Sequence, residues 1–111
     1  MTHGDTLRHL IFASLFLTPT TGFADAASDF AAQCATCHGA TGAGDGTPLP
    51  VSPANFQDPA FWSSRTDDQI KAVIKGGGSS VGKSALMPPL GAGWSDAQLD
   101  AMIAYLKTFK K

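Results

Sequence analysis

The sequence predicts an all-α domain in which three main helices are joined by long loops. Two capping boxes each open a segment whose apolar residues recur at helical spacing, and an Ala-rich segment precedes the only two cysteines. Stretches dense in Gly and Pro separate these segments, and no stretch alternates apolar and polar residues as a half-buried strand would. A chain of 111 residues with 43% hydrophobic residues fits one compact domain.

The first predicted helix covers residues 27–34. This segment is rich in alanine, which has the highest helix propensity of all residues. Serine is a preferred residue at helix N-termini, so Ser28 is a candidate N-cap. The helix is expected to lead directly into the cysteine pair that begins at Cys34.

The second and third predicted helices each begin with a capping box. Thr66 and Gln69 form the first box, and Ser95 and Gln98 form the second. Gly76 is expected to end the second helix. The apolar stripes that follow the boxes predict amphipathic helices and consist of Ile70, Val73 and Ile74 in one helix and Leu99, Met102, Ile103 and Leu106 in the other.

Two loops are expected between these helices, over residues 39–59 and 76–93. Both stretches contain too many Gly and Pro residues for a regular element. The first loop is long for so small a domain, and loops of that length usually serve a site. A flat cofactor is one ligand that such a loop could wrap.

The N-terminal segment is typical of a secretory signal peptide. A short apolar run over residues 10–17 follows Arg8 and precedes small residues. The run is too short for a stable transmembrane helix, which needs about 20 residues. Residues 1–26 are therefore assigned to the signal peptide, with cleavage after Ala24 or Ala26 and a slight preference for Ala26. Residues 27–111 then form a single periplasmic domain without stable membrane insertion.

The charge of the predicted domain argues against nucleic acid as a partner. Residues 27–111 contain seven Lys or Arg and seven Asp, so their net side-chain charge is zero. Nucleic-acid-binding domains usually carry an excess of basic residues. A domain of this size buries only a modest fraction of its surface, and a covalent cofactor would add to its stability.

The segment Cys-Ala-Thr-Cys-His, which ends at His38, has the pattern of covalent haem attachment. The thiols of Cys34 and Cys37 lie one turn apart and can add to two haem vinyl groups, while His38 can bind the iron. A zinc site would need a second ligand pair, but no other cysteine exists, and His3 and His9 lie in the predicted signal peptide. A thioredoxin-like redox pair would need a βαβ pattern, which is missing. The motif therefore predicts one covalent haem c with His38 as proximal iron ligand.

The distal iron ligand is predicted to be Met87. His38 is the only histidine outside the predicted signal peptide, so a second histidine ligand is excluded and methionine is the natural alternative. Met102 falls on the apolar stripe of the last helix, where core packing is the favoured interpretation. Met87 instead lies in a loop before Pro88, and a following proline favours an extended backbone.

The chain resembles the class I cytochromes c, a family of small soluble monohaem proteins, over residues 27–111. The motifs that carry the resemblance are CATCHGATGAGDG, SALMPPLG and WSDAQLDAMIAYLKTF. The resemblance implies the cytochrome c fold, in which the N-terminal and C-terminal helices cross and each contributes an aromatic residue. Phe30 and Tyr105 match these positions. The family often has glycine one turn before the first aromatic residue, where this chain has Ala26.

The resemblance also implies contacts around the haem. In the family, the carbonyl of a loop proline holds the proximal imidazole, and both Pro48 and Pro50 lie near the right distance in sequence. The family also uses hydrogen-bond donors to the haem propionates. Packing for the tryptophans and solvation for the cations remain the favoured interpretations of the four candidates, which are Trp62, Trp94, Arg65 and Lys83.

The expected function is one-electron transfer between redox partner proteins, by a monomer or within a transient complex. Iron with both axial positions filled has no position for a substrate, so the chain is not expected to be an enzyme. A second hypothesis is a haem c subunit of a periplasmic dehydrogenase or oxidase complex. A third is a haem enzyme or gas sensor in which the Met87 ligand is labile. The sequence identifies neither the electron donor nor the acceptor.

Overall fold

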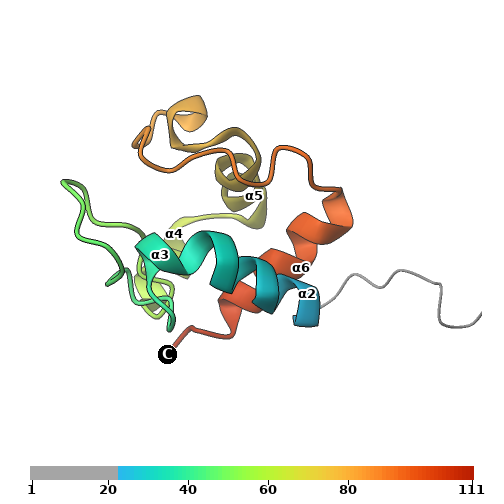
Figure 1. Ribbon diagram of the computed structural model, residues 1–111, viewed down its shortest axis with the longest axis horizontal. Coiled ribbons are helices and arrows are strands. Elements are labelled where there is room, and N and C mark those ends of the chain that lie inside the picture. Colours follow the sequence, from blue (N-terminus) through green and yellow to red (C-terminus); the bar gives the residue numbers. More distant parts are fainter. Residues whose placement is uncertain (1–22) are drawn as a thin grey trace, which may run out of the picture.

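The computed structural model describes residues 23–111, and all regular elements within this range are helical. The predicted all-α class is therefore confirmed (Figure 1). The elements in chain order are α2 (Phe23–Asp29), η1 (Phe30–Cys34), α3 (Ala35–His38), α4 (Pro59–Ser64), α5 (Asp67–Gly76), η2 (Gly78–Val81) and α6 (Asp96–Lys107). The predicted signal-peptide residues before Phe23 lie outside the described residues.

The first predicted helix begins earlier than expected. Elements α2, η1 and α3 follow one another without a break from Phe23 to His38, and η1 is a π-helical turn. Ser28 lies inside α2 and is exposed, so its prediction as an N-cap is wrong. The local sequence around Ser28 suited a cap, but the helix continues on its N-terminal side because α2 packs against α6. A π turn changes the helical register, so the faces on either side of it point in different directions.

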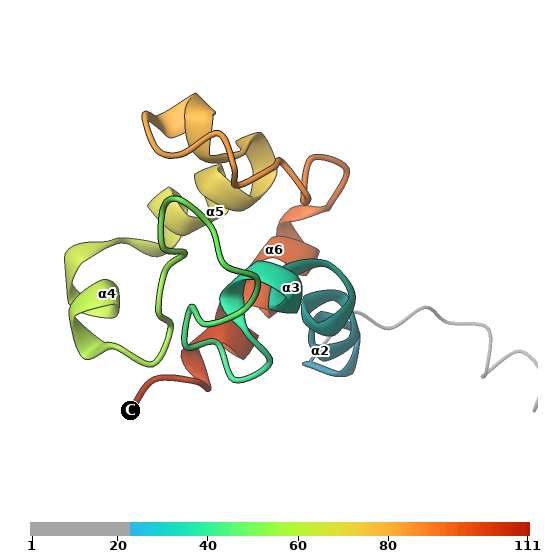
Figure 2. The ribbon, with the colours of Figure 1, turned by 60° about the vertical axis from the view of Figure 1, so that its left-hand side comes forward.

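Helix α2 crosses α6 in both views of the molecule (Figures 1 and 2). Ala26 and Phe30 are 4% and 1% exposed, and both belong to the main hydrophobic core. The Phe30 ring lies 5.6 Å from that of Tyr105 and 5.1 Å from that of Phe109. The predicted aromatic pair at the helix crossing is therefore confirmed, and Phe109 completes a cluster of three rings.

Both predicted capping boxes are present. The Thr66 hydroxyl accepts a hydrogen bond from the Gln69 backbone N–H at 3.2 Å, and the Gln69 side chain accepts one from the Thr66 N–H at 2.9 Å. Ser95 and Gln98 repeat the arrangement at 3.2 and 2.8 Å. These bonds satisfy backbone donors that helix N-termini leave unpaired. Helix α5 ends at Gly76, as predicted.

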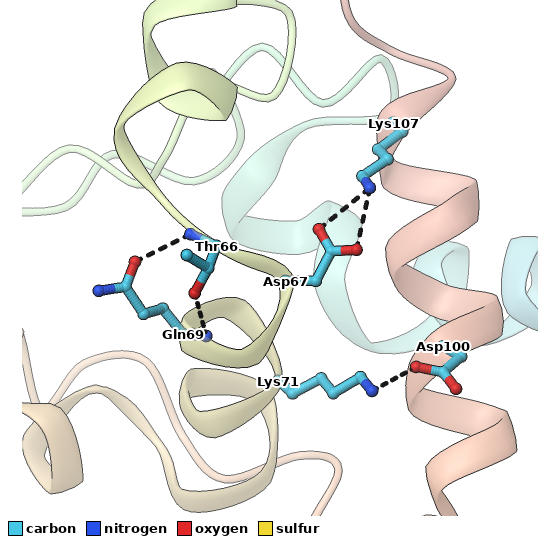
Figure 3. Close-up of polar contacts among 6 residues, drawn as sticks. All are labelled: Thr66, Asp67, Gln69, Lys71, Asp100 and Lys107. Carbon is cyan, nitrogen blue, oxygen red and sulfur yellow. Dashed lines mark hydrogen bonds and ion pairs between the residues drawn. The ribbon is translucent and has the colours of Figure 1, made fainter.

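Two ion pairs connect α5 to α6 on the surface (Figure 3). Lys107 lies 3.0 Å from Asp67, and Lys71 pairs with Asp100. The Asp100 carboxylate, as hydrogen-bond partner, raises the pKa of Lys71. Exposed pairs of this kind contribute about 0–1 kcal/mol each, so the apolar contacts between the helices stabilise the packing more.

The short helix α4 was not predicted from the sequence. Asp58 caps it by accepting a hydrogen bond from the Ala60 N–H at 2.9 Å, and Pro59 occupies the first turn. An acidic cap followed by proline is a recognised helix start, but α4 is too short to show helical periodicity.

None of the helices in the described part of the chain is long and apolar enough to cross a membrane.

Candidate functional site

A cavity of about 730 Å³ lies among the helices and the two long loops. In Figure 2 the loop that follows α3 and helix α4 lie on the same side of α6. The four residues predicted to hold a haem all line this cavity and are Cys34, Cys37, His38 and Met87. Most other lining residues are apolar and include Phe56, Phe61, Ile70, Val73, Ile74 and Leu106. The fold thus brings Met87 to the same space as the cysteine motif, although the two are far apart in sequence.

The cysteine motif occupies the end of the first helix. Cys34 ends η1, and Cys37 and His38 form the last turn of α3. The two thiols are partly buried and are not joined in a disulfide. Burial, together with the negative charge of Asp29, raises the pKa of the Cys34 thiol to about 11. The thiol is therefore protonated at neutral pH in the polypeptide.

The imidazole of His38 is held by a backbone carbonyl. Its Nδ1 lies 3.1 Å from the carbonyl oxygen of Ala54, and the residue is only 9% exposed. Because a carbonyl can only accept, Nδ1 carries the proton, and Nε2 is the nitrogen able to bind a metal. Burial lowers the pKa of His38, which favours the neutral form that a metal ligand requires.

The acceptor for His38 corrects the sequence prediction, because neither Pro48 nor Pro50 supplies it. Both prolines are exposed. The loop returns toward α3 further along the chain, where the Phe56 N–H donates to the Gly42 carbonyl at 2.7 Å. This pairing of distant loop residues places Ala54, rather than a residue nearer in sequence, beside the imidazole.

The segment around Met87 is held against the end of α5. The Gly78 N–H donates to the Met87 carbonyl at 2.9 Å, and the Gly78 carbonyl accepts from the Lys83 N–H at 2.8 Å. A Cβ on Gly78 would overlap the carbonyl oxygen of Ser84, so the close approach requires glycine.

Met102 is 1% exposed in the core and does not line the cavity. Its predicted packing role is confirmed.

The four candidate propionate donors fall into two groups. The Trp62 indole N–H donates to the Phe56 carbonyl at 2.8 Å, and Trp94 packs against the core outside the cavity lining. Arg65 and Lys83 do line the cavity, and the Arg65 guanidinium lies 4.5 Å from the centre of the Phe61 ring. The cavity therefore has two cationic side chains in its wall.

The described residues contain no group of three or more His, Cys, Asp or Glu that could hold a metal ion. A zinc centre in a protein usually has four such ligands, or three with a water molecule in the fourth position. Within residues 23–111, the cysteine motif therefore lacks the partners that a zinc site would need.

Residues 22–106 match the protein family described as cytochrome c oxidase, cbb3-type, subunit III. The chain belongs to this cytochrome c family. No match was found among curated proteins or among solved structures. Cytochrome c domains carry covalent haem c and typically transfer electrons. The resemblance identified from the sequence motifs is thus confirmed.

The cavity residues of this cytochrome c domain fit a haem c. Two unpaired thiols one helical turn apart lie beside an imidazole whose protonated nitrogen is already hydrogen-bonded. A thioether and a mainly apolar wall complete the space, and the two cations would suit the carboxylates of a haem. This set of side chains matches covalent attachment with histidine and methionine ligation.

Three residues contribute to the site in ways that were not predicted from the sequence. Any residue can offer a carbonyl, so nothing in the sequence marked Ala54 as the acceptor for His38. Phe56 stacks on the imidazole, with ring centres 4.7 Å apart, and no local pattern indicates this contact. The run of glycines that includes Gly78 did carry a signal, but it indicated only the end of a helix and the start of a loop.

Proposed function

We propose that this chain is a one-electron carrier with one haem c, bound through Cys34 and Cys37 and ligated by His38 and Met87. The observation that carries the proposal is that all four residues line the same cavity. When bound, the haem supplies reversible one-electron chemistry at its iron. Ligands on both axial positions would leave no position for a substrate, which favours a carrier over an enzyme.

The residues around the cavity have distinct parts in this function. The Ala54 carbonyl fixes the tautomer of His38, so that Nε2 is available as a ligand. The backbone bonds of Gly78 hold the Met87 segment at the cavity wall. The apolar side chains limit the access of water, and this favours retention of a neutral thioether ligand.

The proposal includes export to the periplasm after removal of an N-terminal signal peptide. Of the two candidate cleavage points, the packing of the first helix favours the one after Ala24. Ala26 is 4% exposed within the core against α6, so cleavage after Ala26 would remove a core side chain. Cleavage after Ala24 keeps Ala26 and leaves Asp25 near the helix N-terminus, where a carboxylate is favourable.

A second candidate function is that of a haem c subunit held in an oxidase complex. The description of the matched family, an oxidase subunit, favours this candidate. Purification from the native periplasm separates the two functions. A free carrier elutes as a monomer, whereas a subunit elutes with its complex at high molecular weight.

The test of the proposed function is expression with the signal peptide in a host that attaches haem c. We expect the purified protein to keep its colour after acid and organic extraction and to exceed the polypeptide mass by one haem. The oxidised form should show the weak near-infrared band of methionine-ligated iron. Colour that extracts completely would contradict attachment through Cys34 and Cys37. Rapid binding of carbon monoxide by the reduced protein would show that the Met87 position is open.

A further inference from the structure

Phe56 covers one face of the His38 imidazole. The two ring centres are 4.7 Å apart, and the ring planes are inclined by only 22°, so the rings are stacked. Phe56 is 6% exposed and belongs to the main core. The contact is therefore a buried aromatic stack on the proposed proximal ligand.

The position of Phe56 is fixed independently of His38. Its backbone N–H donates to the Gly42 carbonyl at 2.7 Å, and its carbonyl accepts from the Trp62 indole N–H at 2.8 Å. The Phe61 ring meets the Phe56 ring edge-on, with centres 5.3 Å apart and planes at 75°. Hydrogen bonds on both sides of the residue and a ring at its edge leave Phe56 little freedom to follow a moving imidazole.

The contacts of Ala54 and Phe56 restrain the imidazole in perpendicular directions. The Ala54 carbonyl accepts from Nδ1, whose N–H bond lies in the plane of the ring. This bond by itself leaves the ring able to turn about the hydrogen-bond direction. The stacked ring of Phe56 acts on the face of the imidazole and opposes that rotation. One short segment thus fixes both the tautomer and the plane of His38.

We propose that Phe56 is a positioning residue that sets the plane of the His38 imidazole. The proposal rests on the proposed function, because it concerns a histidine that ligates haem iron. The direction of a ligand imidazole plane determines how its π orbitals overlap the iron d orbitals. In the ferric protein, that direction and the orientation of the methionine ligand together govern the spread of the haem methyl NMR shifts and the anisotropy of the g values. If Phe56 only filled space, its replacement by another apolar residue would leave the methyl shifts and the g values unchanged.

The experiment compares three variants of the holoprotein with the unaltered holoprotein. Phe56→Leu removes the stacked ring while keeping an apolar side chain, and Phe56→Tyr keeps a ring. Phe109→Leu is the matched control, because Phe109 packs against Phe30 and Tyr105 at the helix crossing and does not line the cavity. We expect Phe56→Leu to change the spread of the ferric haem methyl shifts and the g values while the near-infrared band persists. Phe56→Tyr and Phe109→Leu should stay close to the unaltered protein.

Unchanged methyl shifts and g values in Phe56→Leu would overturn the proposal, although the haem-binding function would stand. Should Phe56→Leu fail to mature, the reduced diamagnetic form of the unaltered protein gives a second measurement. Nuclear Overhauser contacts between the Phe56 and His38 ring protons support the stack, and their absence overturns it. Absence of covalent haem from the unaltered protein would instead contradict the proposed function itself.

Discussion

Replacement of Gly78 by alanine tests how the fold presents Met87. A Cβ at this position would overlap the carbonyl oxygen of Ser84, which is backbone and cannot rotate away. The backbone must therefore move apart at the place where Gly78 donates to Met87 and accepts from Lys83. We expect Gly78→Ala to displace the Met87 segment from the cavity wall.

The loss of unfolding free energy in Gly78→Ala can be estimated from the two backbone hydrogen bonds of Gly78. Each contributes about 0.5–1.5 kcal/mol, so the loss of both costs about 1–3 kcal/mol. Gly82→Ala provides a control, because it should lower the free energy of unfolding by a similar amount through backbone strain rather than through a steric overlap. Gly82 has φ of 74° and ψ of 19°, where a Cβ costs about 1–2 kcal/mol, yet no atom lies within 4 Å of that Cβ.

The assay combines denaturant unfolding of the holoprotein with the near-infrared band that reports methionine ligation. Gly78→Ala and Gly82→Ala should lose similar amounts of unfolding free energy, but only Gly78→Ala should weaken the band. Gly93→Ala should be neutral or slightly stabilising, because Gly93 has neither a positive φ nor a neighbour within 4 Å of a Cβ. A full band in Gly78→Ala, or loss of the band in Gly82→Ala, would refute the role assigned to the close approach.

Three further predictions follow. Met87→Ala should retain covalent haem but lose the near-infrared band and lower the reduction potential, whereas Met102→Leu should keep both at a cost below about 1.5 kcal/mol; the opposite result in spectra and redox titration would reassign the distal ligand. N-terminal sequencing of the mature protein should begin at Asp25, and a start two residues later would show that the core tolerates the loss of Ala26. Electron transfer to the native partner should slow only modestly with rising salt in stopped-flow measurements, because residues 25–111, with seven Lys or Arg and eight Asp, carry a net side-chain charge of only −1; a steep loss of rate would reveal a concentrated charged patch.

The capping boxes and the cysteine motif could be predicted from the sequence, because each depends only on residues that are close together along the chain. The capping boxes at Thr66 and Ser95 formed as predicted because each joins residues three positions apart within one helical turn. Cys34, Cys37 and His38 share one short motif, so their proximity to one another needs no knowledge of the tertiary fold. The assignment of Met87 remains a proposal and came from counting the available ligands.

The tertiary structure decided the contacts that join distant parts of the backbone. Ala54, rather than Pro48 or Pro50, holds His38, because a carbonyl belongs to every residue and only the path of the loop selects one. The early start of the first helix likewise depends on the burial of Ala26 against α6, a contact that the local sequence does not contain. Side-chain type thus determined which chemistry is available at the site, and the long-range packing of the loops determined which backbone groups orient it.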